Sequence, residues 1–447
     1  MGMEGAGMSE KWTLLIFLLL LAFCLITGAS VLYALAGGWL LFFLYGLKKG
    51  LTPKELFTLS MKGVKRIRSI LFTFVLIGMI TAVWRMAGTI PYITVQSAAF
   101  ISPSGFVLVT FLLCSFVSFL MGTSLGTAAT MGVICLSVAN ALGVSALHAG
   151  GAMLAGVYFG DRCSPMSTSA LLVATLTETD IYTNIRLMLK TAFFPFLLSC
   201  VLFYLLGTGS GTQGAVPDIG ALFGQAFTLN WIAFLPAAVI LLLSLFRVKV
   251  QLSMAVSILL GVGIALFVQR VPLADIPRFL LTGFSAQDAQ LNKLLGGGGI
   301  LSMARTGAIV ALSATYSGLF EGTGLLDRLK GGIEKIGAAA TPFAGVLATS
   351  VFTALIGFNQ TLPVMLTHQL CKDMVKDRQQ LAIMMENSVI VIPPLIPWSI
   401  AGAVPLVSVG APLASIPFAV FLYLLPLWRL GVSIAQKKKA PRVSAGA

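Results

Sequence analysis

Apolar runs recur along almost the whole chain, from Trp12 to residue 429, and leave few positions for charged side chains. Of the 447 residues, 57% are hydrophobic and only 10% are charged. A water-soluble protein of ordinary composition carries about 25% charged residues. Most of this chain must therefore face lipid or other apolar helices. The sequence predicts a polytopic membrane protein and excludes an ordinary soluble enzyme.

The apolar runs predict helices rather than strands. Only helices and closed barrels satisfy all backbone polar groups in lipid, and these runs lack the alternating pattern of barrel strands. Several runs are shorter than the ~20 residues that a helical span needs. Gly, Pro, Ser and Thr interrupt them. The predicted fold class is therefore an all-α polytopic membrane protein with broken helices.

Basic residues are concentrated in two segments, which account for most of the formal net charge of +14. Residues 48–68 carry seven Lys and Arg side chains against one acid, and the tail 431–447 carries four and no acid. Cytoplasmic loops of membrane proteins are enriched in Lys and Arg, so both segments and both termini are predicted to be cytoplasmic. Segment 48–68 can alternatively lie on anionic lipid as an amphipathic stretch, whereas nucleic-acid binding is not expected.

The first two apolar runs predict a transmembrane hairpin. Run 12–27 follows Lys11 and resembles a signal peptide, but a second run, 31–47, follows it at once. We therefore interpret both runs as a retained hairpin. With both termini on one side of the membrane, the number of full spans must be even.

The chain offers little for enzyme chemistry. Its six cysteines are scattered singly, mostly inside apolar runs, which predicts neither a disulfide framework nor a metal site. Residues 122–126 match the motif G-x-S-x-G around Ser124, but that motif needs a strand-to-helix turn and a histidine base. The only histidines are His148 and His368, and neither has this context. We expect no enzyme activity and no cofactor.

Interrupted stretches occur three times in each half of the chain, in the same order. Nearly constant separations between the paired stretches indicate two structural repeats, although packing sites of small residues and surface loops are the alternatives. The separations are 236 positions for Arg85 and Glu321, 235 for Gly122 and Gly357, and 226 for Gly160 and Glu386.

We divide the chain on this basis into a transmembrane hairpin, two transporter repeats and the segments between and beyond them. The parts are the hairpin 1–47, a basic cytoplasmic loop 48–68, the first repeat 69–210, connecting helices 211–295, the second repeat 296–430 and a basic cytoplasmic tail 431–447.

Three acids, Asp161, Glu321 and Glu386, lie within the interrupted stretches, amid apolar sequence. Carboxylates inside a membrane are costly and indicate a function unless a nearby base pairs with them. Secondary transporters bind substrate and coupling ion where paired broken helices meet, and oxygen donors suit a hard cation. We therefore predict an ion- or substrate-binding site from the acids and the uncharged oxygen donors of the same stretches. These donors are Ser124, Thr127, Ser164, Ser167, Thr168, Asn359, Gln360 and Asn387.

Other charged residues have competing interpretations. Asp180 is predicted to cap the helix that begins near Tyr182. Arg85 ends an apolar run, and Arg305 follows the glycine run 296–299. Each arginine can pair with an intramembrane acid, extend to the membrane interface or hold a substrate carboxylate. We favour the interface for Arg85, whereas an ion pair and an anion-binding role are equally open for Arg305.

Several segments resemble the NhaC family of sodium/proton antiporters, and the resemblance extends over residues 70–430. It implies an ion-transporter-superfamily fold, that is, an inverted-repeat secondary transporter with re-entrant helical hairpins, and Na+ and H+ as the transported ions. The segments are 122–132 (GTSLGTAATMG), 151–167 (GAMLAGVYFGDRCSPMS), 180–189 (DIYTNIRLML), 317–324 (SGLFEGTG) and 395–398 (LIPW).

The sequence departs from the family pattern at acidic positions. It has Thr168, Asn359 and Asn387 where the family usually has acids. Fewer negative charges predict weaker sodium binding or a larger, partly anionic substrate. Sodium- or proton-coupled transport of a small organic acid or amino acid is therefore the alternative function. The discriminating observation is whether Arg305 faces the site.

The resulting hypothesis is Na+/H+ exchange by alternating access at a site between the two repeats. In it, Asp161, Thr168 and Asn359 hold Na+, Glu386 completes the site and Glu321 relays protons. The expected partners are the lipid bilayer and a small ion or organic solute, and a homodimer is left open. The expected location is the bacterial inner membrane.

Overall fold

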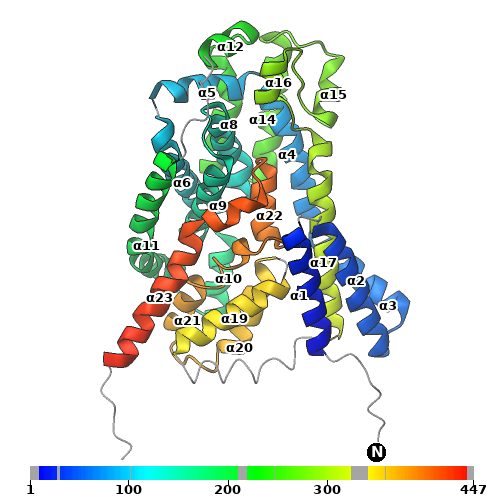
Figure 1. Ribbon diagram of the computed structural model, residues 1–447, viewed down its shortest axis with the longest axis vertical. Coiled ribbons are helices and arrows are strands. Elements are labelled where there is room, and N and C mark those ends of the chain that lie inside the picture. Colours follow the sequence, from blue (N-terminus) through cyan, green and yellow to red (C-terminus); the bar gives the residue numbers. More distant parts are fainter. Residues whose placement is uncertain are drawn as a thin grey trace, which may run out of the picture.

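The computed structural model describes residues 10–27, 31–100, 102–209, 219–246, 248–323, 341–357 and 359–439. Within these ranges the elements are helices, and one isolated bridge joins Phe284 to Gly297. Figure 1 shows an elongated bundle in which the longer helices run between two ends and short helices lie at each end. This confirms the predicted all-α class.

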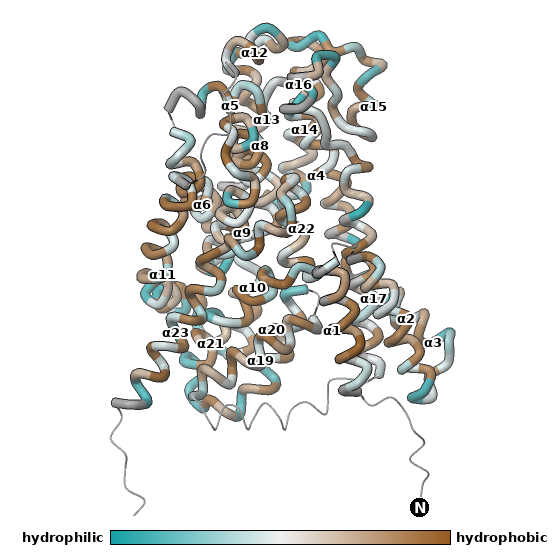
Figure 2. Tube along the Cα trace, viewed as in Figure 1, coloured by the Kyte–Doolittle hydropathy of each residue, from teal (hydrophilic) through white to brown (hydrophobic). Residues whose placement is uncertain are grey.

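Three helical stretches are long and apolar enough to cross a membrane, judged by length and composition: α6 (Pro103–Met121), the stretch Ser124–Ala141 and α11 (Ile181–Gly209). Two bent helix pairs raise the number of candidates to five within the described residues. Large apolar side chains such as Phe116 and Phe193 remain exposed, as expected of surfaces that face lipid. Figure 2 shows hydrophobic residues along much of α6, with hydrophilic residues gathered near the two ends.

The first two helices, α1 (Glu10–Thr27) and α2 (Val31–Lys48), pack against each other as predicted for a hairpin. The segment interpreted as a basic loop instead contains a helix, α3 (Pro53–Arg66). Its start is fixed by a capping box, in which Thr52 N–H donates to Glu55 Oε2 (2.8 Å) and Glu55 N–H donates to Thr52 Oγ1 (3.3 Å). The hydrogen bonds from Thr52 also lower the pKa of the Glu55 carboxyl.

Helix α3 packs against α17 (Ala304–Thr323) rather than lying free. A Cβ atom on Gly63 would lie 2.0 Å from the Ala314 carbonyl oxygen, and one on Gly318 would lie 1.9 Å from the Leu59 carbonyl oxygen. The two glycines therefore let the two backbones touch. Exposed lysines cover the opposite face of α3, so the segment is an amphipathic helix bound to the protein.

The first predicted interruption is a sharp bend. Helix α4 (Arg68–Met86) ends before Gly88, which has a φ of +75°, and α5 (Thr89–Phe100) follows. The two helix axes differ by 66°. As a result α5 lies across one end of the bundle, near the top of Figure 1.

The second and third interruptions meet in space. Gly122, with a φ of +65°, ends α6 and starts α7 (Ser124–Thr127), which continues through a π-helical turn (Ala128–Gly132) into α8 (Val133–Ala141). Helix α9 (Ala146–Cys163) breaks before α10 (Thr168–Thr177). A Cβ atom on Gly122 would lie 2.7 Å from the Met166 carbonyl carbon, so the two breaks are in contact.

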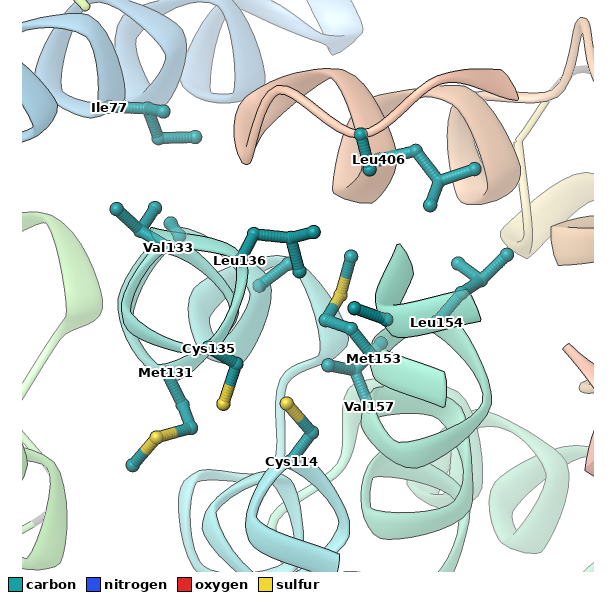
Figure 3. Packing of buried hydrophobic residues seen from close by; sticks show 14 of the residues in the cluster. Ile77, Cys114, Met131, Val133, Cys135, Leu136, Met153, Leu154, Val157 and Leu406 are labelled. Carbon is teal, nitrogen blue, oxygen red and sulfur yellow. The ribbon is translucent and has the colours of Figure 1, made fainter. Parts of the chain in front are cut away.

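An apolar core holds these helices together. Figure 3 shows Cys114 of α6, Cys135 of α8 and Met153 of α9 converging, with Leu406 of α22 (Ile400–Ser408) across from them. The core therefore joins helices from both halves of the chain around the breaks.

The second half contains the other broken elements. Helices α19 (Pro342–Gly357) and α20 (Thr361–Cys371) pack against each other around the interruption at 357–363. Helix α21 (Arg378–Glu386) is followed by irregular turns before α22. Helix α10 of the first half packs against both α20 and α21. The last helix, α23 (Val420–Lys439), returns to the end of the bundle where α1 begins (Figure 1).

Short and connecting elements complete the described structure. Figure 1 places α12, α15 and α16 at the end opposite to α19–α21. Their bounds and those of the other connecting elements are α12 (Ile219–Ala226), η2 (Trp231–Phe234), α13 (Leu235–Leu245), α14 (Val250–Phe267), α15 (Asp275–Thr282), α16 (Ala289–Leu295), η3 (Ile300–Met303), η5 (Pro393–Leu395) and η6 (Leu413–Phe418).

Candidate functional site

Asp161 lies in the last turn of α9 and is only 4% exposed. The helix ends at this point because Pro165 disfavours helical geometry in the residue before it. Ser164 accordingly has extended geometry, with φ −85° and ψ 135°. The carboxyl of Asp161 is thus placed at a helix end inside the protein.

Two hydroxyl groups from different helix starts interact with the Asp161 carboxyl. Ser124 is the first residue of α7, where the left-handed Gly122 redirects the chain. Ser167 caps α10, and its Oγ accepts a hydrogen bond from Ala170 N–H (3.2 Å). The two predicted oxygen donors Ser124 and Ser167 therefore lie beside Asp161.

Glu386 is the last residue of α21 and is fully buried. It lies within electrostatic range of Asp161 although the two residues come from different halves of the chain. Neither carboxylate oxygen of Glu386 has a hydrogen-bond partner, and the same holds for Oδ1 of Asp161. An unpartnered buried polar atom costs about 1–3 kcal/mol, so these three oxygens indicate a place for a ligand.

Arg162 links the two halves at this point. It is fully buried, and its Nε donates to the Glu386 carbonyl oxygen (2.8 Å) while Nη2 donates to Asn387 Oδ1 (2.7 Å). Thr191 of α11 also donates to Asn387 Oδ1 (3.1 Å). One guanidinium thus ties the end of α9 to the end of α21.

We refer to Asp161, Arg162 and Glu386 as the carboxylate cluster. Two carboxylates and one guanidinium give it a formal charge of −1 when all three are ionised. A single additional positive charge, whether a metal cation or a proton, would neutralise it. Buried charge is stable only when it is paired, so the cluster is suited to hold one monovalent cation.

Comparison with known proteins identifies the family. The model of the Na+/H+ antiporter family matches residues 156–435, a region that includes the whole carboxylate cluster. The chain is 30% identical over 392 residues to the Na(+)/H(+) antiporter NhaC of Bacillus subtilis (strain 168), covering 84% of this chain and 86% of that protein. This chain belongs to the Na+/H+ antiporter family. The resemblance seen in the sequence is therefore confirmed.

Two further relatives are a second NhaC and an antiporter of organic acids. The Na(+)/H(+) antiporter NhaC of Alkalihalophilus pseudofirmus is 28% identical over 395 residues, covering 84% of each chain. The malate-2H(+)/Na(+)-lactate antiporter of Bacillus subtilis is 26% identical over 392 residues, covering 85% of this chain and 84% of that protein. All of these relatives are antiporters.

Three of the predicted ligands, Thr168, Asn359 and Gln360, have described surroundings of their own. The side chain of Thr168 is exposed and borders a cavity of about 240 Å3 together with Gln360. Asn359 Oδ1 accepts from Leu362 N–H (2.9 Å) beside the start of α20, and Gln360 Nε2 donates to the Ile390 carbonyl oxygen (3.1 Å). In the described part of the chain, no hydrogen bond joins Thr168 or Asn359 to Asp161. The joint role of Asp161, Thr168 and Asn359 as sodium ligands therefore stays a prediction.

Three further predicted oxygen donors are engaged in hydrogen bonds within the protein, two with the local backbone and one with other side chains. Thr127 Oγ1 donates to the Thr123 carbonyl oxygen (2.8 Å) within the α7 turn. Ser164 Oγ accepts from Met166 N–H (3.2 Å) in the break after α9. Asn387 has its oxygen occupied by Arg162 and Thr191, so this side chain offers a donor rather than an acceptor.

The charged residues outside the cluster also have defined places. Asp180 caps α11 as predicted, accepting from Thr183 N–H (2.7 Å), and this bond lowers the pKa of its carboxyl. Arg85 Nη1 donates to the Gly296 carbonyl oxygen (3.3 Å). Arg305 is exposed at the start of α17, a helix that packs against α2, α3 and α4. The prediction for the Glu321 side chain lies outside the described residues.

Sequence reasoning therefore missed Arg162 and considered Arg305 instead. A usable signal was present, because Arg162 directly follows Asp161 in an interrupted apolar stretch with few other charges. Arg305 is exposed, so it does not supply the buried positive charge that would favour an organic-anion substrate. The neutral residues Thr168, Asn359 and Asn387 leave that alternative as a prediction.

Proposed function

We propose that this antiporter exchanges Na+ for H+ at the carboxylate cluster. The observation that carries the proposal is the set of three buried carboxylate oxygens of Asp161 and Glu386 without hydrogen-bond partners. Carboxylate and hydroxyl oxygens are the ligands that hard cations prefer, and the hydroxyls of Ser124 and Ser167 adjoin Asp161. A proton satisfies the same oxygens by converting an acceptor into a donor.

Competition for the cluster couples the two ions. When Na+ occupies the oxygens, the cluster is neutral and a proton has no charge to balance. When a proton occupies them, Na+ meets a neutral site and binds weakly. Alternating access then requires only that the occupied, neutral cluster favours the conformational change over the empty, charged one.

Arg162 sets the charge that the mobile ion must balance. Without its guanidinium the two carboxylates would carry a charge of −2 and would need two cations for neutrality. Its bonds to Glu386 and Asn387 also hold the ends of α9 and α21 together. We infer that Arg162 limits the cluster to one monovalent cation in each state.

The orientation follows from the placement of basic residues. Helix α3, with exposed Lys54 and Lys62, and the end of α23, with exposed Lys437, lie at the same end of the bundle (Figure 1). Lys and Arg are enriched on the cytoplasmic side of membrane proteins. We therefore assign the end with α19–α21 to the cytoplasm, in a bacterial inner membrane. A homodimer and the proton relay at Glu321 remain predictions.

Reconstitution tests the proposal directly. The purified protein is placed in liposomes with a trapped pH dye, and an outward or inward Na+ gradient is imposed. We expect Na+-dependent proton movement that is lost in Asp161→Asn. Asp180→Asn is the matched control, because the same change there affects only an exposed helix cap. Exchange by Asp161→Asn at the wild-type rate would remove Asp161 from the site.

A further inference from the structure

Pro405 leaves one carbonyl oxygen of α22 without its helical partner. In a helix the carbonyl of residue i−4 accepts a hydrogen bond from the N–H of residue i, and proline has no N–H. Pro405 lies inside α22, so the carbonyl concerned is that of Ala401, a residue only 4% exposed. A buried carbonyl without a partner is costly. The Ala401 carbonyl oxygen therefore needs a hydrogen-bond donor from another element.

Tyr158 of α9 supplies that donor. Its hydroxyl donates to the Ala401 carbonyl oxygen (2.9 Å), and the residue is only 1% exposed. A tyrosine hydroxyl carries one proton, so this bond uses the proton and leaves the phenolic oxygen as an acceptor. The proline in the second half of the chain thus fixes the direction of a hydroxyl in the first half.

Ser124 lies between this acceptor and the carboxyl of Asp161. Its hydroxyl interacts with the Tyr158 hydroxyl and also with the Asp161 carboxyl. Its backbone N–H interacts with the same carboxyl, which holds the residue in place while its O–H bond rotates. A serine hydroxyl has one proton, so at any moment Ser124 donates either to Asp161 or to Tyr158.

The occupant of the carboxylate cluster selects between these two directions. When the cluster is empty, the ionised carboxyl of Asp161 accepts from the Ser124 hydroxyl. A bound Na+ takes a lone pair of the serine oxygen, and a protonated Asp161 donates to the same oxygen. In both occupied states the serine proton must point away from Asp161, and the phenolic oxygen of Tyr158 is the acceptor on the other side.

We propose that Tyr158 is a positioning residue of the ion site, which accepts the Ser124 proton whenever Na+ or H+ occupies the cluster. The inference deepens the Na+/H+ exchange proposed above and rests on it. Tyr158 acts through Ser124 rather than as an ion ligand. Without its oxygen the buried serine proton would lose an acceptor in the occupied states only, so ion binding would weaken.

Tyr158→Phe tests this role, because it keeps the ring and removes the hydroxyl. Na+-dependent proton movement is measured in liposomes at alkaline pH, where protons compete least with Na+. We expect the Na+ concentration for half-maximal exchange to rise about fivefold, as for the loss of one buried hydrogen bond, and the maximal rate to stay within about twofold.

Tyr316→Phe is the matched control, because Tyr316 is also buried and donates to a backbone carbonyl, that of Leu35, at the contact of α17 with α2. Unchanged Na+ affinity in Tyr158→Phe, or an equal rise in both variants, would overturn the proposal while exchange by the wild type stands. Absence of Na+-dependent proton movement in the wild type would overturn the exchange proposal and this one with it.

A double-mutant cycle shows whether Tyr158 acts through Ser124. In Ser124→Ala no serine proton remains to be accepted, so adding Tyr158→Phe should change the half-maximal Na+ concentration by less than about 1.5-fold. A further rise of about fivefold in the double variant would mean that the two residues act independently. That result would contradict the proposed role.

A second double variant separates this role from the bond to Ala401. Tyr158→Phe also leaves the Ala401 carbonyl oxygen without its donor, which lowers the thermal unfolding temperature. Adding Pro405→Ala returns a helical N–H to that oxygen and should raise the unfolding temperature again. The Na+ affinity should stay weak, because the phenolic oxygen is still missing. Wild-type Na+ affinity in Tyr158→Phe/Pro405→Ala would show that Tyr158 serves only Ala401 and would overturn the proposal.

Discussion

The ends of α9 and α21 present the same pattern in different ways. Each helix ends with a buried acid followed by a polar residue: Asp161 and Arg162 in the first half, Glu386 and Asn387 in the second. Asp161 has the hydroxyls of Ser124 and Ser167 beside it, whereas Glu386 has no hydrogen-bond partner for either carboxylate oxygen. The first end is thus solvated by protein groups and the second is not.

The residues that follow the two acids also differ, because one donates and the other accepts the hydrogen bond between the helix ends. Arg162 donates across to the second helix end, whereas Asn387 only accepts that donation through its oxygen. The first end therefore supplies the hydrogen-bond donor, and the second supplies the acceptors. Two similar sequence patterns thus form one asymmetric site. Both carboxylate oxygens of Glu386 lack a hydrogen-bond partner, so a proton or cation stabilises this acid more than Asp161.

The largest expected effect comes from neutralising that acid. Glu386→Gln brings the formal charge of the cluster to zero, so neither Na+ nor H+ is required for neutrality. We expect Na+-driven proton movement in liposomes to fall to the rate of protein-free liposomes. Glu178→Gln, at an exposed position, is the control and should exchange normally. Retention of Na+-dependent exchange by Glu386→Gln would place the exchanged charge elsewhere.

Breaking the link between the helix ends should have the next largest effect. Arg162→Gln removes a buried charge and leaves two carboxylates facing each other, which costs about 3–5 kcal/mol of the free energy of unfolding. Denaturation of the detergent-solubilised protein measures this loss. The control is Arg378→Gln, which removes one partner of an exposed ion pair with Glu178 and should cost about 0–1 kcal/mol. Equal losses in the two variants would show that Arg162 does not hold the two ends.

A change far from both helix ends should lower stability without stopping exchange. Gly63→Ala inserts a methyl group against the Ala314 carbonyl oxygen at the contact of α3 with α17, at a cost of about 1–3 kcal/mol. Thermal unfolding checks the cost, and liposome exchange checks the function. Gly263→Ala on α14 is the matched control, because a Cβ atom there would meet nothing within 4 Å. Loss of exchange in folded Gly63→Ala would tie α3 to transport.

The smallest effect is expected at Thr168. An aspartate at this exposed position restores the acid that the family usually has, but its charge is screened by solvent and contributes about 0.2–1 kcal/mol. We expect Thr168→Asp to change the apparent Na+ affinity of exchange by less than about fivefold. Ser124→Ala, which removes a hydroxyl beside Asp161, should weaken it more. A larger gain of affinity from Thr168→Asp would indicate a conformation in which residue 168 faces the ion.

Much of the fold was predictable because lipid restricts the choices. Apolar runs had to form helices, and Gly88, Gly122 and Pro165 had to interrupt them, since each favours a geometry that a regular helix does not allow. The cap at Asp180 followed from local chemistry in the same way. The basic segment 48–68 was harder, because the apolar side of α3 becomes evident only against α17.

The site was only partly predictable. Position inside apolar sequence singled out Asp161, Glu321 and Glu386, because an acid there is too costly without a function. The structure confirms the burial of Asp161 and Glu386. Their proximity and the role of Arg162 depend on packing between α9 and α21, which are separated by more than two hundred residues. The same packing leaves Arg305 exposed and engages the oxygen of Asn387 with Arg162 and Thr191.

By itself the sequence determined that this protein is a helical membrane transporter, where its helices break and that Asp161 and Glu386 are buried. These properties depend on composition and on neighbours along the chain, which lipid and backbone geometry act on locally. The tertiary structure alone decided which acids share a site and which arginine balances them. Those properties depend on distances between residues remote in sequence, and no local rule fixes such distances.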